Sequence, residues 1–251
     1  MLQVRIREIT IKSPGHNKLL LNNASLDLIE NKVFTILGKN GSGKSTFAKS
    51  ITGLLDKRHY SVWGTVHFRG KDIFALNPVE LLQLRRDSIK YVFQDSVNSF
   101  NQLKKLDYYF ELLSKDKSEI DELLSYFLLP DSKKLYKMHP YEVSGGMAQR
   151  INFVLALLSK PEIIILDEPT SGIDSAIANL FLLKLKEFAS QNRNSVLLIT
   201  QDISFAEKAS DKIAYLSKNR LSTFYEVKDF FRKKDDPLLV DFLEANKHIE
   251  E

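Results

Sequence analysis

Short hydrophobic runs give both ends of the chain a strand-and-helix pattern. Residues 4–11 alternate between hydrophobic and polar, which predicts a half-exposed strand. Further strands are predicted where hydrophobic runs are bounded by turn residues, at 24–28, 33–37, 66–68, 89–93, 163–166, 196–200, 213–216 and 221–225. Helices are predicted from residue 45 to about 55, in a short stretch that begins at Pro78, and over 175–190; a turn is predicted at 69–72.

The middle of the chain has a different character. From about residue 103 to residue 158 the pattern is helical, without a convincing strand, and it is broken near Pro130 and Pro140. We therefore predict an inserted helical subdomain within an α/β domain. The expected division of the single domain 1–251 is a core and β subdomain at 1–95 and 160–232, a helical subdomain at about 96–159, and a C-terminal tail at 233–251 that forms a loose helix.

Composition and charge narrow the class of protein. The 251 residues are 43% hydrophobic and 27% charged, as in an ordinary soluble globular protein. The net charge of +4 is spread along the chain, so no nucleic-acid partner is expected, and the absence of cysteine excludes disulfides and thiolate metal sites. No run approaches the roughly 18 apolar residues of a membrane span, and the N-terminus lacks a signal-peptide pattern. We expect a cytoplasmic protein. If it acts at a membrane, another chain must cross the bilayer.

A glycine-rich segment between a predicted strand and a predicted helix carries the clearest chemical signal. It fits the pattern G-x-x-x-x-G-K-[ST], in which backbone N–H groups surround a triphosphate at a helix N-terminus. In this motif Lys44 reaches the β- and γ-phosphates, and the Ser45 hydroxyl holds Mg²⁺. A glycine-rich turn that matches by chance is the alternative, and the flanking strand and helix argue against it. The predicted nucleotide-binding residues are Gly38, Lys39, Asn40, Gly41, Ser42, Gly43, Lys44, Ser45 and Thr46.

Two carboxylates follow the hydrophobic run at 163–166. In phosphate-loop enzymes such a strand lies beside the loop's own strand, which would put Asp167 at the Mg²⁺ position and let Glu168 polarise the attacking water. An Asp-Glu pair that follows a strand is, by itself, about as often a plain strand end as a catalytic pair. Together with Lys44 upstream and Pro169-Thr170 downstream, it favours the catalytic interpretation.

The segment Val143–Arg150 resembles the signature segment of the ATP-binding-cassette (ABC) ATPases, through Ser144-Gly145-Gly146. A serine N-cap followed by flexible glycines is the structural alternative. Two other segments of that family occur in order, because Gln94 matches its Q-loop and Ser171–Asp174 matches its D-loop. The resemblance covers roughly residues 4–230. It implies a phosphate-loop, RecA-like α/β core with an antiparallel β subdomain and an inserted helical subdomain that carries the signature.

The resemblance also implies partners and cofactors. In relatives, two such domains face head to tail, and the ATP on one phosphate loop is capped by the other domain's signature. Ser144, Gly145, Gly146 and Asp174 would then contact the partner's nucleotide, and Gln94 would take part in metal binding and catalysis. The implied cofactors are ATP and Mg²⁺; the implied partners are a second ATPase and transmembrane permease subunits, which place the chain on the inner face of the cell membrane.

Two stretches narrow the subfamily. Residues 91–101 and 139–147, which include Met147, are similar to segments of bacterial peptide and nickel importers. The longer peptide-importing members often carry a cysteine-rich C-terminal extension, and its absence here resembles nickel or metal-chelate members. The alternative is a soluble ATP-switched interaction protein in a non-transport complex. A kinase-like phosphoryl transferase would leave Ser144-Gly145-Gly146 and Gln94 unexplained.

Two positions depart from the family. Gln201 stands where relatives have the switch histidine, and an amide cannot exchange a proton as histidine can. The aromatic residue that stacks on adenine in relatives is expected near Ser13, where none occurs; His16 is either a substitute or a solvated turn residue. We hypothesise that this chain's own site binds Mg-ATP and turns over slowly, while its signature serves a more active site on a non-identical partner.

Overall fold

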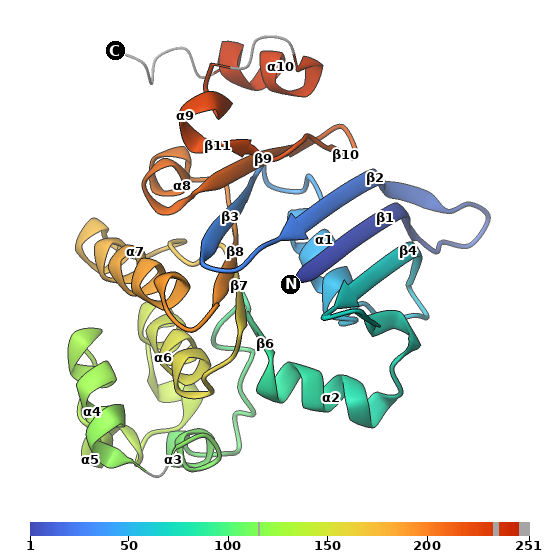
Figure 1. Ribbon diagram of the computed structural model, residues 1–251. Coiled ribbons are helices and arrows are strands. Elements are labelled where there is room, and N and C mark those ends of the chain that lie inside the picture. The colour runs from blue at the N-terminus through green and yellow to red at the C-terminus, as the bar shows by residue number, and fades with distance from the viewer. Residues whose placement is uncertain (115, 233–235, 246–251) are drawn as a thin grey trace.

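The computed structural model describes residues 1–114, 116–232 and 236–245, which form two β-sheets with helices around the larger one (Figure 1). The smaller sheet is antiparallel, with strand order β2-β1-β4-β5. Its strands are β1 (Leu2–Ile11), β2 (Lys18–Leu28), β4 (Tyr60–Phe68) and β5 (Lys71–Asp72). The predicted alternation in β1 is present, because Leu2, Val4 and Ile6 are buried while the residues between them are exposed. One face of this sheet therefore packs against the core.

The larger sheet has the strand order β10-β9-β3-β8-β7-β6, and β11 also pairs with β9. Its central strands are parallel and almost wholly buried, which explains their continuous hydrophobic runs. The strands are β3 (Lys32–Leu37), β6 (Ile89–Val92), β7 (Ile163–Asp167), β8 (Ser195–Thr200), β9 (Lys212–Ser217), β10 (Arg220–Leu221) and β11 (Tyr225–Glu226).

The order of these strands corrects one expectation. The strand that ends in Asp167 does not lie beside the strand of the phosphate loop, because β8 pairs with both and separates them. The registers nevertheless put Leu37 opposite Thr200 and Asp167 opposite Ile199. The loop after β3 and the carboxylates at the end of β7 therefore lie at the same edge of the sheet, one strand apart.

The described residues between β6 and β7 contain helices and no strand, as predicted. These helices are α3 (Leu106–Glu111), α4 (Lys117–Tyr126), α5 (Ser132–Leu135) and α6 (Gly145–Leu158), with a 3₁₀ turn at Pro140–Glu142. The other helices are α1 (Lys44–Ile51), α2 (Pro78–Asp87), α7 (Ser175–Ser190), α8 (Ile203–Ala209), α9 (Val227–Phe230) and α10 (Pro237–Ala245). None of the helices in the described part of the chain combines the length and hydropathy needed to cross a bilayer.

The hydrophobic core lies on both faces of the larger sheet. Alternate residues of β7 point to opposite faces: Ile164 and Leu166 pack with α6 and α7, whereas Ile163 and Ile165 pack with α1 and the antiparallel sheet. Figure 1 shows this layering, with α6 and α7 on one side of the central strands and α1 on the other. The edge of the sheet that holds the loop and the carboxylates is thus fixed by packing on both faces.

Several predicted boundaries were wrong for local reasons. Helix α1 ends at Ile51 instead of near residue 55, because Gly53 adopts a left-handed φ of 63° and the Gly53 and Leu54 N–H groups bond back to the last helical turn. The strand predicted at 221–225 is split into β10 and β11, because Ser222 Oγ accepts the Tyr215 N–H at 2.9 Å and interrupts the ladder.

Two further expectations were incomplete. The turn predicted at 69–72 contains the short strand β5, and β2 begins at Lys18 instead of residue 24. Helix α8 was missed, although Asp202 caps it by accepting the Phe205 N–H.

The predicted tail helix is present as α10, with Leu239 and Phe242 buried; residues 233–235 and 246–251 of that tail lie outside the described residues.

Candidate active site

The glycine-rich loop joins β3 to α1 at the carboxyl edge of the larger sheet. Gly38 could not be another residue without rearrangement, since a Cβ there would lie 2.6 Å from the Leu216 carbonyl oxygen and 2.8 Å from Ser42 Oγ. Ser42 Oγ is buried and has no hydrogen-bond partner among the described residues. A buried polar atom of this kind is normally satisfied, so the loop carries a hydroxyl that is left for a ligand to pair with. Lys39, Asn40 and Gly41 at its tip are exposed.

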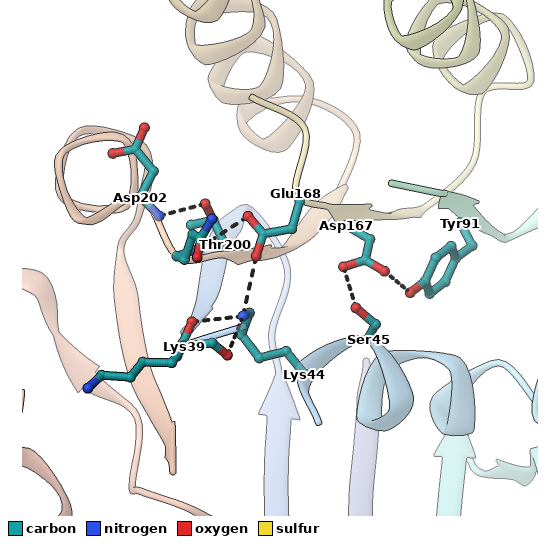
Figure 2. A network of polar contacts seen from close by, with 10 residues as sticks. Lys39, Lys44, Ser45, Tyr91, Asp167, Glu168, Thr200 and Asp202 are labelled. Carbon is teal, nitrogen blue, oxygen red and sulfur yellow. Dashed lines mark hydrogen bonds and ion pairs between the residues drawn. The ribbon is translucent and has the colours of Figure 1, made fainter. Parts of the chain in front are cut away.

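Lys44 turns its ammonium group into this loop. Its Nζ donates to the carbonyl oxygens of Gly38 at 2.7 Å and Lys39 at 3.1 Å, and it forms an ion pair with Glu168 Oε1 at 3.3 Å (Figure 2). The Lys44 side chain is only 5% exposed. A buried positive charge is therefore held among three oxygen atoms at the place where the motif puts the phosphates. Thr46, the last predicted loop residue, lies in the first turn of α1 and is partly buried.

Asp167 accepts hydrogen bonds on both of its carboxylate oxygens. Ser45 Oγ donates to Oδ1 at 2.9 Å and the Tyr91 hydroxyl donates to Oδ2 at 2.8 Å; Figure 2 shows Asp167 bonded to Ser45 below it and to Tyr91 on its right. Burial, followed by the negative charge of Asp167, raises the pKa of Tyr91 far above its usual range, which keeps its hydroxyl protonated as the donor. The sequence predicted Ser45 and Asp167 at this site and missed Tyr91. No local pattern signals Tyr91, because its approach to Asp167 depends on the pairing of β6 with β7.

These residues fit a magnesium ion. A hydroxyl and a carboxylate are oxygen ligands, and Mg²⁺ commonly takes one or two carboxylates together with the substrate's phosphates. The described residues hold no cluster of three or more histidine, cysteine or acidic side chains that could bind a metal without such help. Gln94 is exposed and lines a cavity of about 490 Å³ together with Ser45 and Asp167. The three predicted metal-site residues therefore share one cavity.

Glu168 is held by its backbone as well as by its carboxylate. It has a left-handed φ of 50°, its N–H donates to the Ile199 carbonyl at 2.8 Å, and its own carbonyl accepts from Gln149 Nε2 at 3.1 Å. Its carboxylate is nearly buried, with Oε1 paired to Lys44 and Oε2 accepting the Gln201 N–H at 3.2 Å. Both carboxylate oxygens are thus engaged, Oε1 by the charge of Lys44 and Oε2 by a backbone hydrogen bond.

Gln201 reaches Glu168 through its backbone, and its side chain is exposed. The following residue, Asp202, bonds through its N–H to Thr200 Oγ1 at 3.0 Å, which fixes the backbone at the end of β8 (Figure 2). The amide at position 201 is thus presented at the same edge of the sheet as Glu168. His16 is exposed in the connection between β1 and β2, and no described contact assigns it to this site.

The signature segment faces solvent. Ser144 caps α6 by accepting the Met147 N–H at 3.2 Å, and both Ser144 and Gly145 are exposed. Among the described residues, no hydrogen bond or ion pair joins Ser144, Gly145 or Gly146 to the phosphate loop. Gly146 lies near Ile173, next to the exposed Asp174 that caps α7. The signature and the D-loop thus form one exposed surface of the chain, separate from the loop that carries Lys44.

Gln149 was also missed by sequence reasoning. It lies on α6, five residues after Ser144, and its amide bonds to the backbone of Glu168 in the interior. Helix α6 therefore carries both the exposed signature and a side chain that is hydrogen-bonded to the backbone of Glu168.

The model for the family described as ABC transporter matches residues 21–171, which include the loop, Gln94, the signature and both carboxylates. The chain belongs to the ABC transporter family. This ABC ATPase is 29% identical to the oligopeptide transport ATP-binding protein OppD of Escherichia coli K12, over 98% of this chain and 75% of that protein. It is 30% identical to the dipeptide transport ATP-binding protein DppD of Bacillus subtilis, over 94% of this chain and 74% of that protein.

Solved structures agree with the sequence relatives. The dimeric structure of MJ0796, a bacterial ABC transporter cassette, superposes with a TM-score of 0.79 at 26% identity, over 90% of this chain and 99% of that one. A dimeric post-hydrolysis structure of MJ0796 with bound ADP and Pi gives a TM-score of 0.78 at 25% identity, again over 90% of this chain and 99% of that one. These matches confirm the predicted phosphate-loop core with its antiparallel β subdomain, and they confirm the ABC ATPase class.

Proposed function

We propose that this ABC ATPase binds and hydrolyses Mg-ATP to power a membrane importer of peptides. The observation that carries the proposal is the match, over at least 94% of this chain, to ATP-binding proteins named for oligopeptide and dipeptide transport. Nickel or a metal chelate, which the similarity of residues 91–101 and 139–147 to importer segments also allows, is the second solute class to test. The solute itself would be recognised by other chains of the importer.

In this proposal the loop of residues 38–46 surrounds the phosphates of ATP. Lys44 would leave Glu168 and pair with the β- and γ-phosphates, since both partners compete for the same buried ammonium group. Ser45 and Asp167 would hold Mg²⁺, which neutralises charge on the phosphates, and Gln94 would approach it from the shared cavity. Glu168, released from Lys44, would accept a hydrogen bond from the attacking water.

The proposed assembly is a dimer with a second, non-identical ABC ATPase, bound to permease subunits at the inner face of the membrane. The exposure of Ser144, Gly145 and Asp174 supports a role toward a nucleotide on another molecule. Gln201 supports an unequal pair, because an amide cannot replace the charge and proton of histidine. We further propose the division into a core with a β subdomain at 1–95 and 160–232 and a helical subdomain at about 96–159.

Purification of the tagged chain from its native membrane tests the proposal. We expect a second ABC ATPase and multi-span permease subunits to co-purify, and ATP-dependent uptake of labelled peptide by vesicles that contain the complex. Uptake of nickel instead of peptide would correct the solute class. Recovery of the chain only in soluble complexes, without permease subunits, would replace the transport function with that of an ATP-switched interaction protein.

A further inference from the structure

Tyr91 contacts the site but has no part in the reaction described above. It lies on β6, opposite Ile165 of the neighbouring parallel strand β7. Side chains two residues apart on a strand share a face, so Tyr91, Ile165 and Asp167 project from the same face of the sheet. The Tyr91 side chain can therefore reach along β7, and its hydroxyl lies 2.8 Å from Oδ2 of Asp167 (Figure 2).

The two oxygens of Asp167 are held by two different donors. Oδ1 is bonded by Ser45, whose hydroxyl is also a proposed metal ligand, whereas Oδ2 is bonded by Tyr91. Asp167 is only 3% exposed, so bulk water does not replace either donor. The Tyr91 hydroxyl is thus the contact that can fix the carboxylate when Ser45 is engaged elsewhere.

The ring of Tyr91 packs against Phe93, the residue before Gln94, and against the hydrophobic core. It packs against Phe93 with the two ring centroids 4.7 Å apart, and it contacts the hydrophobic cluster on the α1 side of the sheet. A phenylalanine would keep this packing and remove only the donor. The two contributions of Tyr91 can therefore be separated experimentally.

We propose that Tyr91 is a positioning residue that orients the Asp167 carboxylate toward Mg²⁺, an inference that rests on the Mg-ATP site proposed above. Hydrogen bonds to a ligating carboxylate set its direction, and their loss typically weakens metal binding or activity by about 10- to 100-fold. The residue acts through Asp167 and does not itself touch the substrate.

The test compares Tyr91→Phe with the wild-type protein and with Tyr126→Phe. Tyr126 is a matched control, since its hydroxyl at the end of α4 donates to the Leu180 carbonyl of α7. Mn²⁺ serves as the probe, and its binding to each protein is measured by electron paramagnetic resonance in the presence of a non-hydrolysable ATP analogue. The affinity for the analogue is measured separately without metal.

We expect Tyr91→Phe to bind Mn²⁺ roughly tenfold or more weakly, with unchanged metal-free affinity for the analogue, while Tyr126→Phe matches the wild type in both. Equal Mn²⁺ affinities in Tyr91→Phe and the wild type would overturn the inference. A parallel loss of metal-free affinity would also overturn it, because the effect would then be general damage to the loop. If the wild type itself shows no nucleotide-dependent Mn²⁺ binding, the Mg-ATP proposal fails, and this inference falls with it.

Discussion

Replacing Glu168 with glutamine should separate nucleotide binding from hydrolysis, because Glu168 holds Lys44 before ATP arrives. The two charges lie 3.3 Å apart, and at an effective dielectric constant of about 20 they attract by roughly 5 kcal/mol. Glutamine would keep an oxygen near Lys44, and the carbonyls of Gly38 and Lys39 would remain. We therefore expect about 1–2 kcal/mol of this attraction to appear as a change in nucleotide affinity.

The sign of the change follows from competition. In the wild type, the phosphates must displace Glu168 from Lys44; in Glu168→Gln that opposition is reduced, so ATP should bind about five- to thirtyfold more tightly. Without nucleotide the variant should be less stable, because Lys44 loses its counter-charge. Hydrolysis should fall by about 10²- to 10⁴-fold, as for loss of a general base.

The assay is calorimetric titration with a non-hydrolysable ATP analogue, together with thermal unfolding with and without that analogue. Glu162→Gln is the control, since it also removes one negative charge from an ion pair, here with Arg69. Glu162 directly precedes β7 and so lies at the opposite end of that strand from Asp167. We expect the analogue to raise the melting temperature more for Glu168→Gln than for the wild type or the control. Nucleotide affinity equal to or weaker than that of the wild type would refute the idea that Glu168 competes for Lys44.

Three further predictions test the loop, the departure from the family and the core. Gly38→Ala should lower the free energy of unfolding by about 1–3 kcal/mol and weaken ATP binding, because its Cβ would meet the Leu216 carbonyl; urea unfolding and nucleotide titration check this. Gln201→His should speed single-turnover hydrolysis in the isolated protein, and equal, fast rates in both proteins would remove the slow-site hypothesis. Phe153→Ala should cost about 3–5 kcal/mol in urea unfolding, since the ring is buried and stacks on Phe181 at 4.8 Å; an effect below about 1 kcal/mol would contradict this packing.

The sequence could predict the strands of the core because burial on both faces demands uninterrupted hydrophobic residues. The segment 163–167 is such a strand, and the hydrophobic run alone indicates that its carboxylates stand at its end. Strand order was not predictable in the same way, because β3 and β7 each need only a hydrophobic neighbour and many strands satisfy that need. The insertion of β8 between them follows from chain topology, which no local pattern encodes.

Within the site, too, some contacts are predictable from a local motif and others depend on the topology of the chain. A motif predicts which residues approach the phosphates, since the pattern itself encodes a loop and a helix N-terminus. It does not encode donors that arrive from other strands and helices, such as Tyr91 from β6 and Gln149 from α6. The pairing of Lys44 with Glu168 likewise depends on the end of β7 lying one strand from the loop.

Glu168 shows why the orientation of a buried side chain needs more than its own motif. A left-handed backbone is unfavourable for a non-glycine residue by about 1–2 kcal/mol, so it persists only where surrounding contacts impose it. Here the Ile199 carbonyl and the Gln149 amide hold the Glu168 backbone, and the carboxylate is thereby aimed at Lys44. Because Gln149 lies on the helix that begins at the exposed Ser144, a movement of that helix by a partner would act on the backbone of Glu168. The signature surface and the Glu168 backbone are thus linked through α6 within one chain.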